Sequence, residues 1–440
     1  MKKQFNLAPI FKDNMVFQSN KPIRIFGTCK KGIEITISFL NQETTFRTKS
    51  KEFLVELHPE GLQEKGFSFK VYTKKQIETV YNCLIGEVFF IAGSKNVSMS
   101  LKDSYYEDDM ENFNVRFINL REGLDENLEF SNEVTWNVCG KANLENISAL
   151  SYLTAKHISE RIHVPIGIIV VDYHATTIFS WMSVQDSSTH LNISEYIQSL
   201  PESESKALHV NLMYEQLIKQ VVPFSFKMVI FYQGENDYEH YHLFDIALIR
   251  IIKSFRMTFK DSELPVIITQ IAGYSYPNIE EENINQIRYA QGSVMDESRK
   301  IFVVSAVDLG DEDTDIPKEK LILSRRIANV VLEKFYSIGK NSISPTYYSY
   351  QKQHDGIVIH TKNNYLNLTS HSRQNLGFTY TKNGVDFIVA KNIEIMNGRI
   401  MIKDVSDIKE IRYAYKSFPF CDIYTTNELP LLPFRIKFKD

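Results

Sequence analysis

The spacing of apolar residues divides the chain into three regions, the first of which ends near residue 85. Within it, apolar and polar positions alternate over 33–37 and again over 67–71. Alternation with a period of two is typical of strands that bury one face. A small β-sandwich over residues 1–85 is the simplest fold for this pattern.

The second region, residues 86–336, has short apolar runs that alternate with helical patterns. The runs predict strands at 88–92, 114–120, 165–171, 228–232, 265–270 and 301–306. Helical spacing of apolar residues is found near 147–162 and 324–336. Strand, helix and strand in succession predict an α/β domain, a parallel sheet with helices on both faces, whose ligands bind at the carboxyl ends of the strands.

The third region, residues 337–440, returns to strand patterns. Alternating apolar positions predict strands at 356–360, 386–389 and 399–402. The expected architecture is therefore a central α/β domain between an N-terminal and a C-terminal β domain.

Composition excludes several classes of protein. The 440 residues are 43% hydrophobic and 24% charged, with a net charge of −4, as in a globular protein of several domains. No basic stripe supports nucleic-acid binding. No run approaches the roughly 18 apolar residues of a membrane span, and no signal-like apolar stretch follows the Met-Lys-Lys start, so we expect a cytoplasmic protein. The four cysteines make no CxxC spacing, which argues against zinc and for free thiols.

The strand at 88–92 ends in Gly93-Ser94-Lys95-Asn96, small and polar residues at which the chain must turn. A strand, a sharp turn and a helix are the geometry that raises a nucleophile from the carboxyl edge of a parallel sheet. The residue raised there should carry a hydroxyl or a thiol, and here it is Lys95.

Four such turns together resemble the motifs of the sialate O-acetylesterase-like carbohydrate esterases, a branch of the SGNH hydrolases. That family has GQSNM, VPIG followed by SWGGT, YQGExN and DLGDxxDIHPxxK; this chain has matching blocks at 93–97, 164–182, 232–237 and 307–320. Residues 13–18 resemble the family's opening motif DNMVLQ, and residues 412–415 and 429–435 resemble its closing motifs RYAW and LPxxPFR. The resemblance implies an SGNH α/β domain with flanking β domains that acts on acetylated sugars, without a metal or another cofactor.

The family's chemistry needs a serine nucleophile, a histidine base and an aspartate that orients the histidine. The resemblance puts the nucleophile position at Lys95. A neutral lysine would form a stable amide and a charged lysine is no nucleophile, so Lys95 cannot replace the serine.

The histidine of DIHP is also missing, because the chain reads Asp315-Ile316-Pro317. One alignment deletes the histidine and keeps Asp315 at the position of the triad aspartate. The other places Ile316 at the histidine and Thr314 at the aspartate. Neither alignment leaves an imidazole.

Other family positions suggest substrate-binding residues. The glycine pair of SWGGT falls on His174 and Ala175, where side chains replace bare backbone. The block at 232–237 is better preserved and implies that Gln233, Glu235 and Asn236 contact substrate, although this family usually has the asparagine one residue later.

Each unusual residue has two readings. Lys95 either forms a Ser-Lys dyad with Ser98, three residues on, or forms an ion pair with an acidic residue. We favour the ion pair, for which the candidate partners are Asp237, Glu235 and Asp315. Ser94 is either a shifted nucleophile or the N-cap of a helix that begins near Lys95, which we favour.

The remaining candidates have ordinary explanations. His174 is either a relocated base or ligand-binding group, or a loop histidine, and His240 and His242 are expected to be solvated at a helix start. The acidic cluster of the DLGD block, a solvated loop rather than a metal site, consists of Asp311, Glu312, Asp313 and Asp315.

Two hypotheses about function follow. The favoured one is a degenerate esterase that binds a glycan or a protein partner. The alternative is an active O-acetylesterase of sialic acid or another sugar, with an unusual nucleophile and base. The sequence does not set the oligomeric state.

Overall fold

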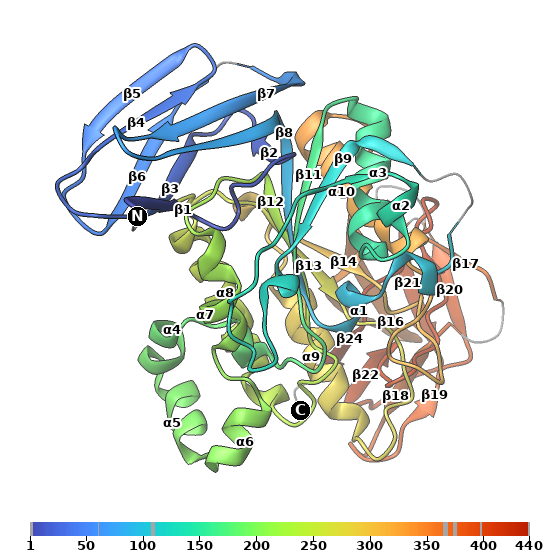
Figure 1. The fold of residues 1–440 in the computed structure, drawn as a ribbon. Coiled ribbons are helices and arrows are strands. Elements are labelled where there is room, and N and C mark those ends of the chain that lie inside the picture. The colour runs from blue at the N-terminus through green and yellow to red at the C-terminus, as the bar shows by residue number, and fades with distance from the viewer. Residues whose placement is uncertain are drawn as a thin grey trace. The chain divides into compact units, whose positions relative to one another are not determined.

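The computed structural model describes residues 3–59, 61–106, 111–363, 368–372, 376–396 and 398–438 (Figure 1). The chain forms two compact units. The first consists of Met1–Phe231 and Arg250–Val266, and the second of Tyr232–Ile249 and Ile267–Asp440. The expected division into domains at residues 85 and 336 stays a prediction.

The first unit contains most of the predicted strands of the N-terminal and central regions. Its strands are β1 (Phe5–Leu7), β2 (Val16–Gln18), β3 (Ile23–Cys29), β4 (Glu34–Phe39), β5 (Gln42–Arg47), β6 (Glu52–Leu57), β7 (Gln63–Tyr72), β8 (Ile77–Gly93), β9 (Asn112–Asn119), β10 (Asn137–Cys139), β11 (Ile166–Asp172) and β12 (Met228–Tyr232). Its helices are α1 (Lys95–Ser98), α2 (Lys141–Leu144), α3 (Ala149–Ile162), α4 (Val184–Thr189), α5 (Leu191–Ser199), α6 (Glu202–Ala207), α7 (Leu212–Gln216) and the second half, from Arg250 onward, of α8 (Tyr241–Thr258).

Strand β8 joins the N-terminal strands to the α/β sheet of this unit. Up to Ile85 it pairs antiparallel with β7, and from Glu87 onward it pairs parallel with β11. Strand β11 is parallel to β9 as well, and the sheet continues in the order β10-β9-β11-β8-β12. Helix α3 packs on β9 and β11. Because both faces of the sheet are covered, residues 88–92 are all buried, as their continuous apolar run predicts.

A polar contact fixes β8 where it enters this sheet. Gln18 of β2 donates to the buried Glu87 carboxylate over 2.8 Å and accepts from the Val88 backbone N–H, also over 2.8 Å. Ser19 donates to the same carboxylate over 3.1 Å. Gln18 ends the opening motif, so this motif has a structural role: it satisfies polar groups that the sheet buries.

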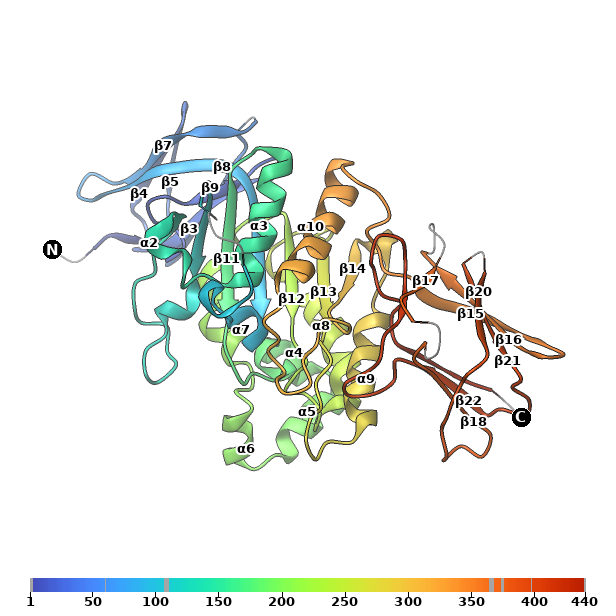
Figure 2. The ribbon, with the colours of Figure 1, turned by 90° about the vertical axis from the view of Figure 1, so that its right-hand side faces the viewer.

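The second unit contains the remaining central elements and all of the C-terminal strands (Figure 2). Its central elements are β13 (Val266–Gln270), α9 (Glu281–Ser293), β14 (Ile301–Ser305) and α10 (Leu321–Tyr336), with β13 beside β14. Its C-terminal strands are β15 (Thr346–Gln353), β16 (Gly356–Lys362), β17 (Thr369–Ser370), β18 (Phe378–Thr381), β19 (Ile388–Val389), β20 (Ile393–Met396), β21 (Arg399–Lys403), β22 (Glu410–Tyr413), β23 (Ile423–Tyr424) and β24 (Phe434–Lys437).

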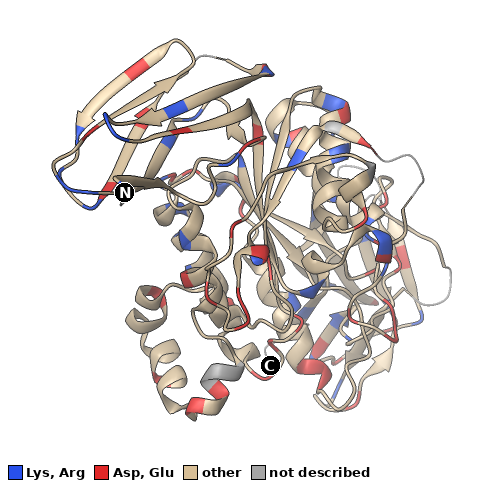
Figure 3. Cartoon of the chain, in the orientation of Figure 1, with Lys and Arg blue, Asp and Glu red and all other residues tan. Residues whose placement is uncertain are grey.

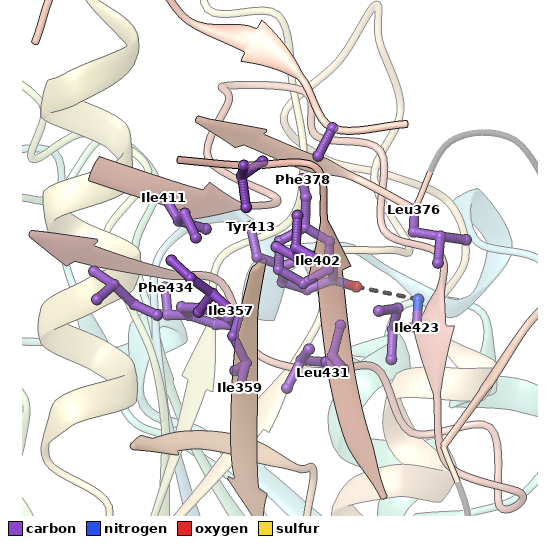
Figure 4. Packing of buried hydrophobic residues seen from close by; sticks show 14 of the residues in the cluster. Ile357, Ile359, Leu376, Phe378, Ile402, Ile411, Tyr413, Ile423, Leu431 and Phe434 are labelled. Atoms are coloured by element: carbon purple, nitrogen blue, oxygen red, sulfur yellow. Dashed lines mark hydrogen bonds between the residues drawn. The ribbon is translucent and has the colours of Figure 1, made fainter. Parts of the chain in front are cut away.

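The C-terminal strands form two four-stranded sheets, β15-β16-β21-β20 and β19-β18-β22-β24, and the pair β17-β23. Their buried side chains make one hydrophobic cluster, which includes Ile359, Phe378 and Tyr413 (Figure 4). The Tyr413 hydroxyl is satisfied inside this cluster because it accepts a 3.1 Å hydrogen bond from the Ile423 backbone N–H.

The closing motifs hold helix α9. Arg435 donates to the Glu282 carboxylate over 2.7 Å, and Arg412 lies 3.8 Å from the same side chain. The guanidinium of Arg412 also lies over the rings of Phe387 and Tyr415, at 3.8 and 4.7 Å from their centres. These contacts combine charge pairing with cation–π attraction, so the closing motifs also have a structural role.

The α/β class predicted from the sequence is confirmed. Each of the six strands predicted in the central region coincides with an observed strand, with ends shifted by a few residues at most except at β8, which begins earlier. The two predicted helices correspond to α3 and α10. In the described part of the chain, lysines and arginines are interspersed with acidic residues (Figure 3), and no helix is long and apolar enough to cross a membrane.

Candidate functional site

The turn after β8 has the strand-turn-helix geometry that its sequence predicts. Ser94 has an extended backbone, with φ −86° and ψ −151°, and stands at the N-cap of α1, which begins at Lys95. The side chain of Ser94 is completely buried, but it does not cap the described helix. The predicted helix start is therefore confirmed, whereas a capping role of the serine side chain is wrong.

The environment of Ser98 tests whether Lys95 forms a Ser-Lys dyad. Its side chain is half-buried. The hydroxyl of Ser98 is buried and has no hydrogen-bond partner among the described residues. A Ser-Lys dyad needs a hydrogen bond between these two groups, so the dyad is excluded in this conformation. The acidic partners proposed for Lys95 belong to the second unit, and that ion pair stays a prediction.

Asp172 ends β11 and is a residue that the motif comparison did not single out. Its backbone is in register with Gly93 of β8, and its side chain is 1% exposed. Arg121 lies 3.0 Å from one carboxylate oxygen of Asp172. Neither oxygen of Asp172 has an aligned hydrogen bond among the described residues, so the contact is one of charge with charge. The signal in the sequence was an aspartate directly after a fully apolar strand.

The next residues of this turn form a small aromatic cluster. His174 is exposed and stacks on Tyr173, with ring centres 4.8 Å apart and planes 17° apart. His209 meets Tyr173 edge-on at 5.7 Å. Partial burial, and then the charge of His174, lower the pKa of His209. The cluster brings two imidazoles to one aromatic ring, and His209 was missed in the sequence because it lies far from every motif.

Ala175, at a glycine position of the family motif, has a backbone conformation that favours glycine. Its φ is +60°, in the left-handed region that favours glycine. An alanine in this conformation has a conformational cost of about 1 kcal/mol.

In the second unit, the turn after β12 is held by its own side chains. Gln233 donates to the Asp237 carboxylate over 2.9 Å, and Gln291 of α9 donates to the Gln233 carbonyl over 2.8 Å. Glu235 is 2% exposed and Asn236 is half-buried. These contacts tie Gln233 to the scaffold of the turn, while its assignment, with Glu235 and Asn236, to substrate binding stays a prediction.

The histidines that follow this turn differ in their environments. His242 is exposed, as expected at the start of α8. His240 is only 5% exposed, and burial lowers its pKa. The prediction that His240 is solvated is wrong, because it precedes the helix in a turn that the fold buries.

Lys320, at the end of the DLGD block, is completely buried. It donates a 2.6 Å hydrogen bond to the Pro317 carbonyl. Burial lowers the pKa of Lys320 to about 7, and the strongest opposing effect is the negative charge of Glu235. The family positions of the lysine and the glutamate are therefore electrostatic neighbours within the second unit.

The rest of this block is a structured loop. Asp308 forms a paired salt bridge with Arg326 of α10, with both contacts at 2.7 Å. A Cβ at Gly310 would lie 2.1 Å from the Gly273 carbonyl, so only glycine allows this approach. Asp311, Glu312 and Asp313 are exposed, as expected for a solvated loop, whereas Asp315 is half-buried.

Among the described residues, no group of three or more His, Cys, Asp or Glu side chains could hold a metal ion. The four cysteines are free, two of them buried and two partly buried. The first unit holds a buried hydroxyl, carboxylates and imidazoles, and the second unit, described by itself, holds carboxylates and a buried amine.

Comparison with known proteins agrees with this geometry. Residues 131–316 match a family described as carbohydrate esterase, sialic acid-specific acetylesterase. The sialate O-acetylesterase of Mus musculus is 22% identical over 395 residues, covering 73% of this chain and 72% of the mouse protein. The Homo sapiens enzyme is 21% identical over 368 residues, covering 73% and 69%.

A solved structure of a carbohydrate acetylesterase from Xanthomonas citri has nearly the same fold. It matches with a TM-score of 0.86 and 19% identity, over 99% of this chain and 100% of that one. At this identity the likeness concerns the fold.

Proposed function

The chain belongs to the sialate O-acetylesterase-like carbohydrate esterases of the SGNH hydrolase superfamily, and from this premise we propose that it binds a glycan or a protein partner and has lost efficient ester hydrolysis.

The observation that carries the proposal is the residue at the nucleophile position. Lys95 follows directly on the buried turn of β8, where the family has its serine, and the neighbouring Ser98 hydroxyl makes no hydrogen bond to it among the described residues. A lysine acylated by an acetyl ester would be left as an amide, which does not turn over.

The loop that should carry the base supports the same conclusion. Residues 308–320 contain no histidine, yet the loop keeps its structural contacts, including the salt bridge of Asp308 with Arg326. Loss of the serine or of the histidine alone lowers kcat by about 10⁴- to 10⁶-fold in hydrolases with a Ser-His-Asp triad. Retention of the scaffold with loss of both groups fits a binding protein better than an enzyme.

The nature of the ligand follows from the relatives. They are named for esterases of sialic acid or other carbohydrates, so a sugar is the ligand that we favour, and a protein partner is the other outcome. His174, Ala175, Gln233, Glu235 and Asn236 are the residues that we assign to sugar binding.

One observation favours a second function, an active O-acetylesterase with an unusual nucleophile and base. Ser94 is a buried hydroxyl at the carboxyl end of β8, and the imidazoles of His174 and His209 belong to the same unit as Ser94. In this hypothesis Ser94 attacks the acetyl carbonyl while one of these histidines accepts its proton, and the ester bond to the sugar breaks as the histidine passes that proton to the departing sugar oxygen. Water then hydrolyses the acetyl-serine to acetate.

Hydrolysis of p-nitrophenyl acetate and of an O-acetylated sialic acid separates the two functions. We expect hydrolysis of both esters to be no faster with the wild type, Ser94→Ala or Lys95→Ala than in buffer alone. Turnover by the wild type that Ser94→Ala abolishes would establish the esterase and overturn our preference. A reverse test combines Lys95→Ser with a histidine inserted after Ile316, and we expect hydrolysis above that of the wild type.

A further inference from the structure

Residues 416–420, which we call the aromatic strap, present a regular pattern of exposed side chains. Lys416, Phe418 and Phe420 are exposed, whereas Ser417 and Pro419 between them are buried. Phe418 is 41% exposed and Phe420 is 50% exposed. This alternation leaves two phenylalanine rings exposed to solvent, where apolar area is unfavourable unless something covers it.

A buried arginine fixes the backbone of the strap. Arg288 of α9 is completely buried. It donates to the carbonyls of Lys416 and Ser417 in the strap, over 2.6 and 2.8 Å. It also donates to the carbonyls of Ile271 and Ala272, which follow β13, over 3.3 and 2.7 Å. One guanidinium therefore locks the strap to the carboxyl end of β13, which lowers the entropy that a ligand would have to remove on binding.

Further aromatic rings adjoin the strap. Tyr274, half-buried, donates its backbone N–H to the Ser417 carbonyl over 3.1 Å. A Cβ at Gly273 would lie 3.1 Å from both the Phe418 ring and Pro419, so this backbone lies against the strap. Tyr274 and Tyr276 meet edge-on at 4.7 Å. The Phe418 ring thus lies against the backbone directly before Tyr274, beyond the carboxyl end of β13.

Tyr276 adds an unsatisfied polar group. Its side chain is 5% exposed, and its hydroxyl has no hydrogen-bond partner among the described residues. Burial, and then the charges of Glu235 and Asp315, keep its pKa well above the usual value, so the hydroxyl carries its proton. A buried donor without an acceptor is unfavourable, and an oxygen of a ligand would relieve it.

Negatively charged side chains beside the strap restrict the charge of the ligand that can bind. Asp311 donates its backbone N–H to the Gly273 carbonyl over 3.1 Å, and Ser275 donates its backbone N–H to the Glu312 carbonyl over 3.4 Å. The exposed carboxylates of Asp311, Glu312 and Asp313 therefore belong to a loop that contacts the residues beside the strap. Carboxylates accept hydrogen bonds from sugar hydroxyls but repel a sugar that carries its own carboxylate.

We propose that Tyr274, Phe418 and Phe420 form a stacking subsite for the rings of an uncharged glycan, with the Tyr276 hydroxyl as a donor to one of its oxygens. The apolar C–H face of a pyranose covers an aromatic ring, while its hydroxyls meet the carboxylates of the adjacent loop. This inference rests on the proposed glycan-binding function and narrows it to neutral sugars.

Calorimetric titration with neutral xylohexaose and with acidic sialyllactose tests the proposal. We expect xylohexaose to bind the wild type more tightly than sialyllactose does. The double variant Phe418→Ala/Phe420→Ala should bind xylohexaose about tenfold more weakly, and it should fold normally because both rings are exposed. Tyr348→Ala, which removes another exposed ring of the same unit, is the matched control and should bind as the wild type does.

The outcomes separate this inference from the function beneath it. Xylohexaose binding that the double variant leaves unchanged overturns the stacking subsite but not the glycan-binding function. Tighter binding of sialyllactose than of xylohexaose overturns the restriction to neutral sugars. If the wild type binds neither sugar, the subsite and the glycan-binding function both fail, and the protein-partner form of the proposal is the one left.

Discussion

Lys320 donates a 2.6 Å hydrogen bond to the carbonyl of Pro317 while its side chain is completely buried in the second unit. Hence an amine that is normally charged and solvated is held inside the protein, next to the loop in which the family has its catalytic histidine. Glu235 opposes the effect of burial on its pKa but does not cancel it.

The stability of the protein should depend on pH through Lys320. Burial lowers its pKa from 10.5 to about 7, so between these values the folded state binds fewer protons than the unfolded state. The free energy of unfolding should therefore rise with pH from about 7 toward 10. Urea unfolding at several pH values should show this rise in the wild type and a smaller rise in Lys320→Met.

Lys318→Met is the matched control, because Lys318 lies in the same loop and is exposed. Its unfolding free energy should follow the pH dependence of the wild type. Parallel curves for Lys320→Met and the wild type would contradict the lowered pKa.

Arg121 should stabilise the first unit through Asp172. The carboxylate of Asp172 is 1% exposed, and Arg121 lies 3.0 Å away. Arg121→Met leaves a buried charge without its counterion, and we expect a loss on the order of 2 kcal/mol, because the arginine itself is partly exposed. Guanidinium denaturation should recover much of this loss in Arg121→Met/Asp172→Asn, in which no buried charge is left.

The control for this pair is Arg161→Met, because Arg161 belongs to the same unit and is exposed. Its effect should stay within about 0.5 kcal/mol. Equal losses of unfolding free energy in Arg121→Met and Arg161→Met would show that the ion pair with Asp172 does not stabilise the unit.

The pKa of His209 should depend on its neighbour His174. Burial lowers the pKa of His209, and the charge of His174 lowers it further. Removing that charge in His174→Ala should raise the pKa of His209 toward, but not to, its usual value, since burial remains. NMR titration of the imidazole signals measures this shift, and His58→Ala, which removes an exposed histidine, should leave it unchanged. A His209 signal that titrates identically in His174→Ala and the wild type would rule out the interaction.

Gly234 should tolerate no side chain in the turn after β12. Its φ is +149°, and a Cβ there would lie 3.0 Å from atoms of Ile271, Ile287 and Gln291. We expect Gly234→Ala to lower the unfolding free energy by about 1–3 kcal/mol through this crowding. Gly384→Ala is the control. Gly384 has φ +89°, and no described atom lies within 4 Å of a Cβ placed there. This variant should therefore show the effect of backbone strain alone, a loss of about 1 kcal/mol. Thermal unfolding with equal losses for both would contradict the crowding.

Local patterns in the sequence predicted most of the fold. The apolar run at 88–92 indicated a strand buried on both faces, and all five of its residues are buried. The small residues after it indicated a turn, and α1 begins at Lys95 as expected. The prediction failed at His240, because whether a histidine in a polar turn is solvated depends on segments packed over it, which no local pattern contains.

By itself the sequence determined the order of strands and helices and the identity of the residues at the nucleophile and base positions, because these depend on neighbours in the chain and on matching motifs. Only the tertiary structure decided which of the polar residues are buried, which charges Asp172 and Lys320 meet, and that Arg288 locks residues 416–417 to the end of β13. These properties arise from contacts between segments 51 to 129 residues apart. Desolvation depends on all of the atoms around a group rather than on its neighbours in sequence.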